Sequence, residues 1–177
     1  MAHLKKILHI NHAKTKSVVD MYSSMLFDKT DQLVSLRYFN VYGKYEENKG
    51  HMASVVYKFF NEKNTNKITL FDNSENYKRD FVYIDDIVDI NMFFLQNSNY
   101  SGIYNVGTGK CRSFLDIANI FKERYDIEID YIPMPTRLEG KYQEYTQSDN
   151  SKILNITNHK YHSLESGIEK YLNYLES

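Results

Sequence analysis

A buried strand that ends in polar residues constrains this chain most. Residues 36–43 read Leu-Arg-Tyr-Phe-Asn-Val-Tyr-Gly, so an apolar stretch leads directly to Asn40 and then to a glycine. The loop that follows brings Lys49 back toward the exit of that strand. Ligands of open α/β sheets bind in the crevice beyond the carboxyl ends of the strands. The sequence therefore places Asn40 and Lys49 where we expect small-molecule chemistry.

Predicted strands and helices alternate along the chain, which indicates an α/β fold. The periodicity predicts helices over residues 15–27, 52–60, 86–95, 114–121 and 164–175, and strands over residues 33–39, 68–71, 79–83, 103–106 and 127–132. In this pattern the chain opens on a helix, whereas a doubly wound nucleotide-binding fold opens on a strand, a glycine-rich turn and a helix. We therefore expect this chain to start in the middle of such a fold.

Composition limits the partners and the compartment. A chain of 177 residues suits one domain, and its hydrophobic content of 42% and charged content of 25% are typical of soluble globular proteins. The net charge of −1 gives no electrostatic reason to expect nucleic acid or an anionic membrane as partner. Cys111 is the single cysteine, and no segment approaches the ~20 apolar residues of a membrane span. We expect a soluble protein of the reducing cytoplasm.

Two short motifs invite a chemical interpretation but favour a structural one. Gly107-Thr108-Gly109 follows a predicted strand, yet position 112 is Arg where a dinucleotide fingerprint has its third glycine, which favours a tight turn. Asp85 and Asp86 resemble a carboxylate pair, but adjacent residues of a helix do not share a face. Capping is the better interpretation, with Asp85 as the N-cap. The six histidines show no metal-ligand spacing, so we expect no metal site.

Spacing alone leaves two interpretations open for each of the two most interesting cations. Lys49 is either a solvated loop lysine or a catalytic residue. Arg79 either pairs with a nearby carboxylate such as Asp80 or Glu75, or uses its planar guanidinium to bind a diphosphate. Composition and periodicity support no more than a partial α/β domain. They leave open whether this domain has an anion-binding rim.

Several longer motifs resemble the extended short-chain dehydrogenase/reductases. They lie at residues 36–43, 49–54, 70–83, 105–109 and 131–135. Within that superfamily, residues 138–143 (Leu-Glu-Gly-Lys-Tyr-Gln) and 145–149 (Tyr-Thr-Gln-Ser-Asp) resemble the ADP-glycero-manno-heptose 6-epimerases. The similarity runs from about Lys16 to the C-terminus, although its Arg-Asp-Phe-Val-Tyr motif is shared with other sugar-nucleotide epimerases and dehydratases.

The resemblance implies a fold, a reaction and a cofactor. The fold would be the C-terminal portion of a Rossmann-like extended short-chain dehydrogenase/reductase. Residues 1–48 would be a remnant of the nucleotide-binding sheet, and residues 49–177 mainly the smaller substrate-binding α/β domain with interleaved sheet elements. The family inverts C6 of an ADP-linked heptose on the route to lipopolysaccharide. Its bound NADP takes a hydride from C6, the transient ketone turns over, and the hydride returns to the other face.

The resemblance also implies a role for individual residues. Lys49 would exchange a proton with the substrate and contact the cofactor, Lys16 would hold the nicotinamide ribose, and Val41 would touch the cofactor. The implied substrate-binding residues are Asn40, His51, Phe71, Asp72, Asn73, Ser74, Arg79 and Tyr142. Asn40 would contact the sugar, residues 71–74 would line the ADP end, Arg79 would clamp the diphosphate and Tyr142 would close the sugar pocket. Lys58 stands where the family commonly has a histidine and receives no role.

Two departures from the family pattern bear on activity. His12 stands four residues before Lys16, where the catalytic tyrosine belongs, so this motif is broken. The glycine-rich N-terminal half of the family, on the order of 100 residues or more, has no counterpart here. We expect a chain that binds an ADP-sugar without turning it over alone, with a homo-oligomer or a complementary N-terminal half as partner. The alternative is a non-catalytic ADP-sugar-binding module or a subunit-docking fragment.

Overall fold

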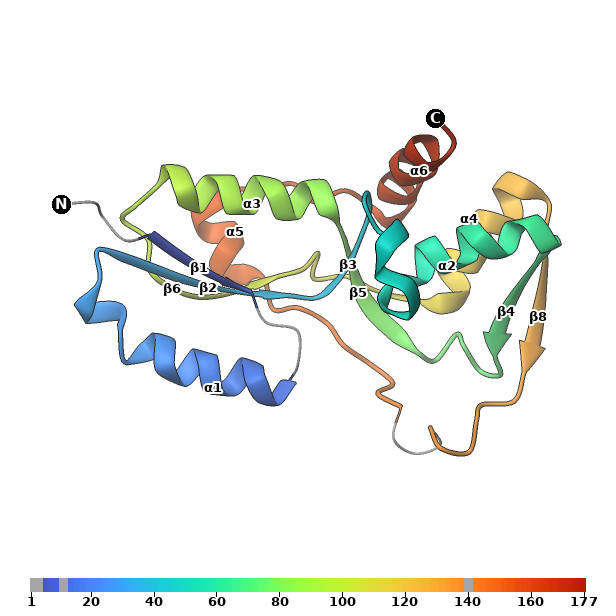
Figure 1. Cartoon of the computed structure of the whole chain (residues 1–177), viewed down its shortest axis with the longest axis horizontal. Helices are drawn as coiled ribbons and strands as arrows, with labels where there is room; N and C mark the ends of the chain where they lie inside the picture. Colours follow the sequence, from blue (N-terminus) through green and yellow to red (C-terminus); the bar gives the residue numbers. More distant parts are fainter. Residues whose placement is uncertain (1–4, 10–12, 139–141) are drawn as a thin grey trace.

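The chain folds into a mixed α/β architecture in which helices pack around short sheets (Figure 1). The computed structural model describes residues 5–9, 13–138 and 142–177, without the side chains of residues 5–9 and 13–17. One sheet has the parallel order β1 (Lys5–His9), β2 (Gln32–Tyr38) and β6 (Gly102–Val106). A second joins β3 (Asn40–Tyr42) in parallel to β5 (Lys78–Tyr83), which pairs antiparallel with β7 (Cys111–Ser113), and a third pairs β4 (Lys67–Phe71) in parallel with β8 (Glu128–Ile132). The α/β prediction is confirmed.

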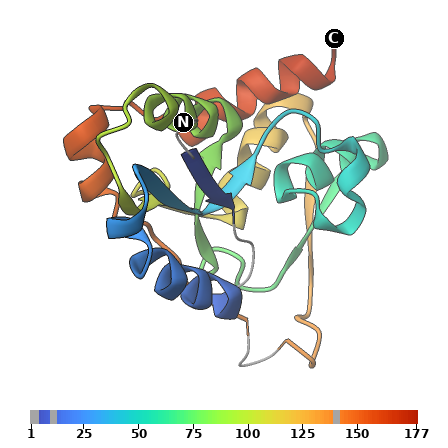
Figure 2. The same ribbon diagram turned by 60° about the vertical axis from the view of Figure 1, so that its left-hand side comes forward.

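Helices cover both faces of the first sheet. Helix α1 (Ala13–Ser24) lies on one face, and α3 (Ile84–Gln96) and α5 (Ser151–Thr157) lie on the other (Figures 1 and 2). The apolar side chains between the sheet and α3 and α5 are Val34, Leu36, Tyr104, Val106, Ile87, Ile90, Phe94 and Ile153. A parallel strand covered on both faces needs an almost continuous apolar run, which β2 provides.

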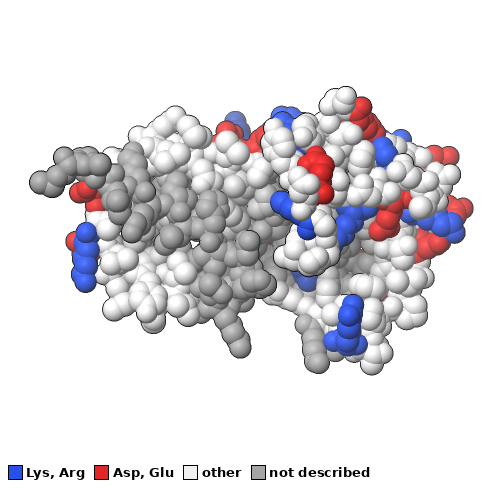
Figure 3. Space-filling view, in the orientation of Figure 1, with Lys and Arg blue, Asp and Glu red and all other residues white. Residues whose placement is uncertain are grey.

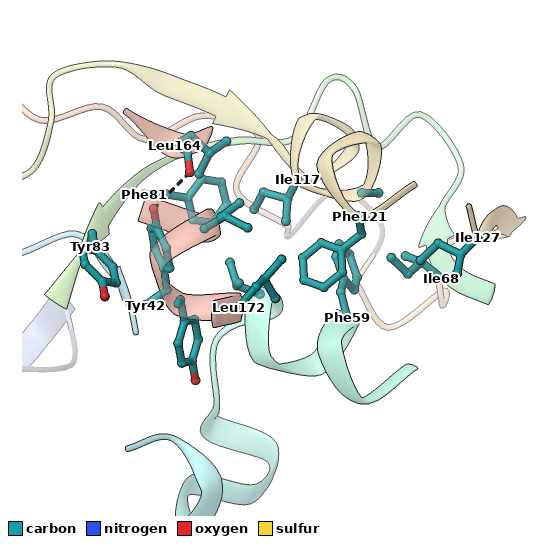
Figure 4. Close-up of a cluster of buried hydrophobic side chains, with 14 of the residues drawn as sticks. Tyr42, Phe59, Ile68, Phe81, Tyr83, Ile117, Phe121, Ile127, Leu164 and Leu172 are labelled. Carbon is teal, nitrogen blue, oxygen red and sulfur yellow. Dashed lines mark hydrogen bonds between the residues drawn. The ribbon is translucent and has the colours of Figure 1, made fainter. Parts of the chain in front are cut away.

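A second core lies among three other helices. These are α2 (Val55–Glu62), α4 (Phe114–Tyr125) and α6 (Leu164–Leu175). Phe59 of α2 and Phe121 of α4 meet edge to face with ring centroids 6.0 Å apart (Figure 4). Gly167 lets α6 approach the sheet, because a Cβ there would overlap the Tyr42 hydroxyl. The segments that form the two cores alternate along the sequence. For example, β6 and α5 pack with β2 in the first core, although they follow elements of the second core in the chain.

Serine side chains set the starts of the helices in the second core. Ser54, Ser113 and Ser163 each accept a hydrogen bond from the backbone N–H three residues later. Asp116 returns the interaction to the Ser113 N–H at 2.8 Å, which completes a capping box. The 3₁₀ turns are η1 (Phe27–Lys29), η2 (Glu47–Met52) and η3 (Lys63–Thr65).

Two sequence predictions about element order and capping are wrong. The chain does not open on a helix, because Lys5–His9 forms β1 and pairs with β2. Asp85 is not the N-cap of α3, since the helix begins at Ile84 and both aspartates lie in its first turn. Asp86 instead accepts bonds of 2.9 Å from His159 and from His162. Burial opposes the charge on Asp86, yet these hydrogen bonds hold the pKa of its carboxyl below the usual value.

No helix in the described part of the chain is long and apolar enough to cross a membrane.

Candidate functional site

A cavity of about 1260 Å³ opens where β2 ends and β3 begins. Its lining comes from α1, β2, β3, β5, β6, α2, α4, the loop before α2, and Gln143 and Thr146. Four of the residues singled out in the sequence, Asn40, Val41, Lys49 and Arg79, lie together on its wall. The fold thus brings these four side chains to one site, as expected for the crevice beyond the carboxyl ends of strands.

Asn40 and Val41 reach the cavity because a short parallel strand carries them there. Asn40 is paired with Phe81 of β5, and Val41 is paired with Val82. Asn40 is exposed, whereas Val41 is half-buried and packs against the core of the first sheet. An amide beside an apolar surface can orient a polar ligand while the apolar side chain excludes water.

Lys49 lies on the 3₁₀ turn η2, in the loop between β3 and α2. Its ammonium is 3.5 Å from a carboxylate oxygen of Glu46, and half of the lysine side chain is exposed, at 50%. Glu46 itself is buried and lines the same cavity. Lys49 therefore lines the cavity from a position beside a buried carboxylate, with half of its side chain still in contact with solvent.

Arg79 is buried, with 8% of its surface exposed. It donates to the backbone carbonyls of Lys78, at 2.8 Å, and of Gln143. Its guanidinium carbon lies 5.2 Å from the ring centre of Tyr142 and 5.8 Å from that of Phe114. Burial lowers the pKa of Arg79. Among the described side chains no carboxylate forms an ion pair with this guanidinium. The interpretation that pairs Arg79 with Asp80 or Glu75 is therefore wrong.

Asp80 is unavailable to Arg79 because its carboxylate holds the Gly-Thr-Gly turn. It accepts hydrogen bonds from the Thr108 N–H at 2.8 Å, the Thr108 hydroxyl at 2.6 Å and the Gly109 N–H at 2.9 Å. The Ser148 N–H adds a fourth at 3.0 Å. At Gly107 a Cβ would lie 2.7 Å from the Asp80 carboxylate, so only glycine fits. The N–H groups of this turn therefore bind the Asp80 carboxylate of the same chain.

The residues expected at an ADP end begin with Phe71, the last residue of β4, and continue into the loop after it. The Asp72 N–H donates to the Ile132 carbonyl at 2.9 Å, and Asn73 has a left-handed backbone with φ of 60°. Asn73 lines a second cavity of about 580 Å³. Phe71, Asp72 and Ser74 line neither of the two cavities. The Ser74 hydroxyl is buried and has no hydrogen-bond partner in the described part of the chain.

Tyr142 and His51 occupy different surroundings. The half-buried Tyr142 ring meets Tyr77 edge to face at 5.1 Å and lies beside Arg79. Burial raises the pKa of Tyr142, and the neighbouring Arg79 opposes that rise. His51 is exposed and does not line the cavity, but its carbonyl accepts a 2.9 Å bond from Lys58, which does.

Other predicted positions lie outside what the structure describes. Lys16 is part of α1, but its side chain is among those not described. His12 and residues 139–141 lie outside the described residues altogether. In the described remainder, no group of three or more His, Cys, Asp or Glu side chains could hold a metal ion.

The cavity offers positive charge that its own carboxylates do not neutralise. Its cationic lining residues are Arg37, Lys49, Lys58 and Arg79, and its carboxylates are Asp20 and Glu46. Asp20 pairs with Arg37 at 2.6 Å and Glu46 pairs with Lys49. Among the described lining residues, Lys58 and Arg79 therefore remain for an anionic ligand. On the face seen in Figure 3, cationic and acidic side chains intermingle over the right-hand half.

Sequence reasoning missed Lys58, Glu46 and Ser54 at this site. Lys58 follows the cap Ser54 by one helical turn, so helical spacing places both on one face and could have drawn attention to it. Glu46 looks like any solvated acidic loop residue, and no local pattern reports its burial.

Comparison with known proteins adds a family and a set of similar folds. The model of a family described as the NAD dependent epimerase/dehydratase family matches residues 12–107. ADP-L-glycero-D-manno-heptose-6-epimerase of Brachyspira hyodysenteriae is 44% identical over 171 residues, which cover 93% of this chain and 54% of that relative. The chain thus spans about half the length of this curated relative.

Solved structures of epimerases are also similar to this chain. The Helicobacter pylori ADP-L-glycero-D-manno-heptose-6-epimerase superposes with a TM-score of 0.75 at 31% identity, covering 88% of this chain and 48% of that one. The Thermotoga maritima UDP-glucose 4-epimerase with UDP-glucose has a TM-score of 0.75 at 27% identity, covering 90% and 51%. The fold is therefore that of Rossmann-like extended short-chain dehydrogenase/reductase epimerases, of which this chain matches a part.

Proposed function

Because this chain belongs to the NAD dependent epimerase/dehydratase family, we propose that it forms the substrate-binding part of an ADP-glycero-manno-heptose 6-epimerase. The proposed ligand is an ADP-linked heptose, and the proposed setting is heptose biosynthesis for lipopolysaccharide in the cytoplasm. The relative that is 44% identical and the Helicobacter pylori structure both bear the name of this enzyme, which supports the choice of sugar nucleotide.

The observation that carries the proposal is the surroundings of Arg79. A buried guanidinium without a carboxylate partner is costly unless an anion completes its hydrogen bonding. The Lys78 and Gln143 carbonyls use only some of its N–H groups, and the rings of Tyr142 and Phe114 restrict its orientation. A diphosphate matches this planar set of donors because it presents paired anionic oxygens.

Other residues fit the sugar end of such a ligand. Asn40 on the cavity wall would bond a sugar hydroxyl, and Tyr142, which lies beside Arg79, would close the pocket over the sugar. Lys49 would exchange a proton at Nζ with the reacting carbon or its hydroxyl, a role that requires contact with the substrate. Lys58 of α2 adds a second cation to the lining of the cavity. Residues 71–74 would contact the ADP portion, and His51 remains a proposed substrate contact.

A nicotinamide cofactor fits the described residues only in part. NADP is the proposed hydride carrier, with Lys16, Val41 and Lys49 as its contacts. Val41 and Lys49 lie on the cavity wall and suit its nicotinamide end. The Gly-Thr-Gly turn after β6 does not suit its pyrophosphate, because its N–H groups already bind Asp80. We therefore propose that turnover requires a dinucleotide site from a segment outside the described residues, in this polypeptide or another.

Calorimetric titration with ADP-ribose tests ligand binding, since this molecule joins ADP to a sugar through a diphosphate. We expect the purified chain to bind it, and Arg79→Met to weaken the affinity by about 10- to 150-fold through loss of charged hydrogen bonds. Arg124→Met is the matched control because Arg124 pairs with Glu176 away from the cavity. Absence of heat at millimolar ADP-ribose, or equal affinity of the Arg79 variant and the wild type, would refute the proposal.

A second candidate is a non-catalytic ADP-sugar-binding module, and an epimerisation assay tests whether this chain turns over an ADP-heptose by itself. The occupied Gly-Thr-Gly turn favours binding without turnover by this chain alone. We expect no conversion of an ADP-heptose when the purified chain and NADP are mixed. Conversion under those conditions would show that the chain already contains a working cofactor site.

A further inference from the structure

Glu46 is a buried carboxylate for which the proposed reaction has no use, with 2% of its surface exposed. One of its oxygens accepts the Ser54 N–H at 2.9 Å and faces the Lys49 ammonium at 3.5 Å. The other accepts the Ser54 hydroxyl at 2.6 Å and the Gly43 N–H at 3.4 Å. A single carboxylate therefore contacts both ends of the loop and the lysine between them.

These contacts fix the orientation of the carboxylate independently of Lys49. Gly43 directly follows β3 and Ser54 is the N-cap of α2, so both partners are anchored at the ends of regular elements. The Ser54 hydroxyl donates to Glu46 and accepts the Tyr57 N–H at 3.2 Å, which ties the carboxylate to the start of the helix. A charged acceptor makes such hydrogen bonds shorter and stronger.

Lys49 gains a fixed partner from this arrangement. A lysine side chain has several rotatable bonds, and half of this one is exposed to solvent. The backbone also contributes, because the Lys49 N–H donates to the Glu46 carbonyl at 3.0 Å. We propose that Glu46 is a positioning residue that holds the Lys49 ammonium at the cavity wall. This inference rests on the proposed function, in which Lys49 is the residue that contacts the substrate.

The rate of lysine acylation in the ligand-free protein tests the inference. Acylation requires the lysine nitrogen to meet the reagent, and a carboxylate partner that holds this nitrogen at the cavity wall hinders the encounter. With peptide mass spectrometry, Lys49, Lys44 and Lys58 are followed in one sample. We expect Glu46→Gln to speed acylation of Lys49 by about two- to fivefold, the range for a partly exposed ion pair, and to leave the other two lysines unchanged.

Two further variants make the result specific. Glu47→Gln removes the exposed neighbouring charge and should leave the Lys49 rate unchanged. Glu46→Asp keeps the charge but withdraws it from the lysine, so Lys49 should react faster here too, by less than in Glu46→Gln. Should Glu46→Gln not fold, the aspartate variant decides. An unchanged Lys49 rate in a folded Glu46 variant, or an equal rise at all three lysines, would overturn the inference.

A double-mutant cycle on ADP-ribose affinity shows whether Glu46 acts through Lys49 when ligand binds. We expect Glu46→Gln to weaken binding about two- to fivefold in the wild type and to have no effect in Lys49→Met. Equal effects in both backgrounds would assign Glu46 a purely structural role. If the wild type does not bind ADP-ribose, the proposed function fails, and the acylation rates, which involve no ligand, still decide the inference.

Discussion

Helices α1 and α6 have the same length, 12 residues each, but they are held in the fold by different forces. Helix α6 buries an apolar face made of Leu164, Ile168, Tyr171 and Leu172. Helix α1 exposes most of its described apolar residues: Val18 is 49% exposed, Met21 55%, Tyr22 60%, and Met25, just beyond its end, 62%, whereas Val19 is half-buried. The buried residues described on α1 are the polar Asp20 and Ser23.

Polar contacts take the place of apolar ones beneath α1. Asp20 accepts bonds from the Ser35 hydroxyl at 3.1 Å and from Arg37 Nε at 2.8 Å, both on β2. Asp20 and Arg37 also line the large cavity, so this ion pair forms part of the wall on that side. The comparison teaches that an amphipathic pattern predicts a helix without saying which face the rest of the fold covers.

The largest effect is expected where α6 is buried. Ile168→Ala removes a fully buried side chain from the second core and should lower the free energy of unfolding by about 2–5 kcal/mol, measured by urea denaturation. Glu169→Ala, exposed on the same helix, is the control and should stay within about 0.5 kcal/mol of the wild type. Equal small effects of the two substitutions would mean that α6 is not docked as described.

Removing the charge beneath α1 should have an intermediate effect. Asp20→Ala leaves Arg37 and Ser35 without their acceptor. Because the Arg37 side chain is 39% exposed, water compensates part of the loss. We expect a loss of about 1–3 kcal/mol. Hydrogen exchange should accelerate in α1 and remain slow in α6. Asp28→Ala, on the exposed turn after α1, should change neither, and uniform acceleration in both helices would contradict separate docking.

The contrast also shows how far sequence predicts fold. Residues 164–175 were predicted as a helix and form α6 with those bounds, because each buried position follows the helical period. Strand β1 was missed, since its short apolar stretch between lysines and histidine becomes a strand only by pairing with β2. The burial of α1 could not be predicted either, because it depends on which partner the apolar residues meet.

At the site, too, local sequence patterns predict some features, and contacts between residues far apart in the sequence decide the others. The rule for the carboxyl ends of strands predicted that Asn40 and Lys49 would lie together, and the structure places both on one cavity. Spacing left the partner of Arg79 open, because Asp80 is adjacent in sequence yet binds the turn at residues 107–109. The burial of Glu46 arises from folding of Gly43 and Ser54 around it, which no local pattern reports.

A smaller, pH-dependent contribution is expected at the C-terminal end of α6. Glu176 accepts bonds from Tyr125, Arg124 and Lys63, and these, led by Tyr125, lower its pKa from 4.5 to about 2. Because the pKa is depressed on folding, the stabilisation is present above about 4.5 and is lost as pH falls toward 2. Glu176→Gln should flatten stability against pH in that window, by at most about 1 kcal/mol at this partly exposed site. A wild-type curve already flat there would contradict the interaction.

The smallest effect is expected on the exposed face of α1. Met21→Gln replaces a side chain that is 55% exposed, so little apolar surface returns to water and the free energy of unfolding should change by less than about 0.5 kcal/mol. The measurement is urea denaturation at two protein concentrations a hundredfold apart, beside Ile168→Ala. A loss comparable to that of Ile168→Ala would mean that this face is covered in solution. If that loss grew with concentration, the cover would be another molecule, because only association makes stability depend on concentration.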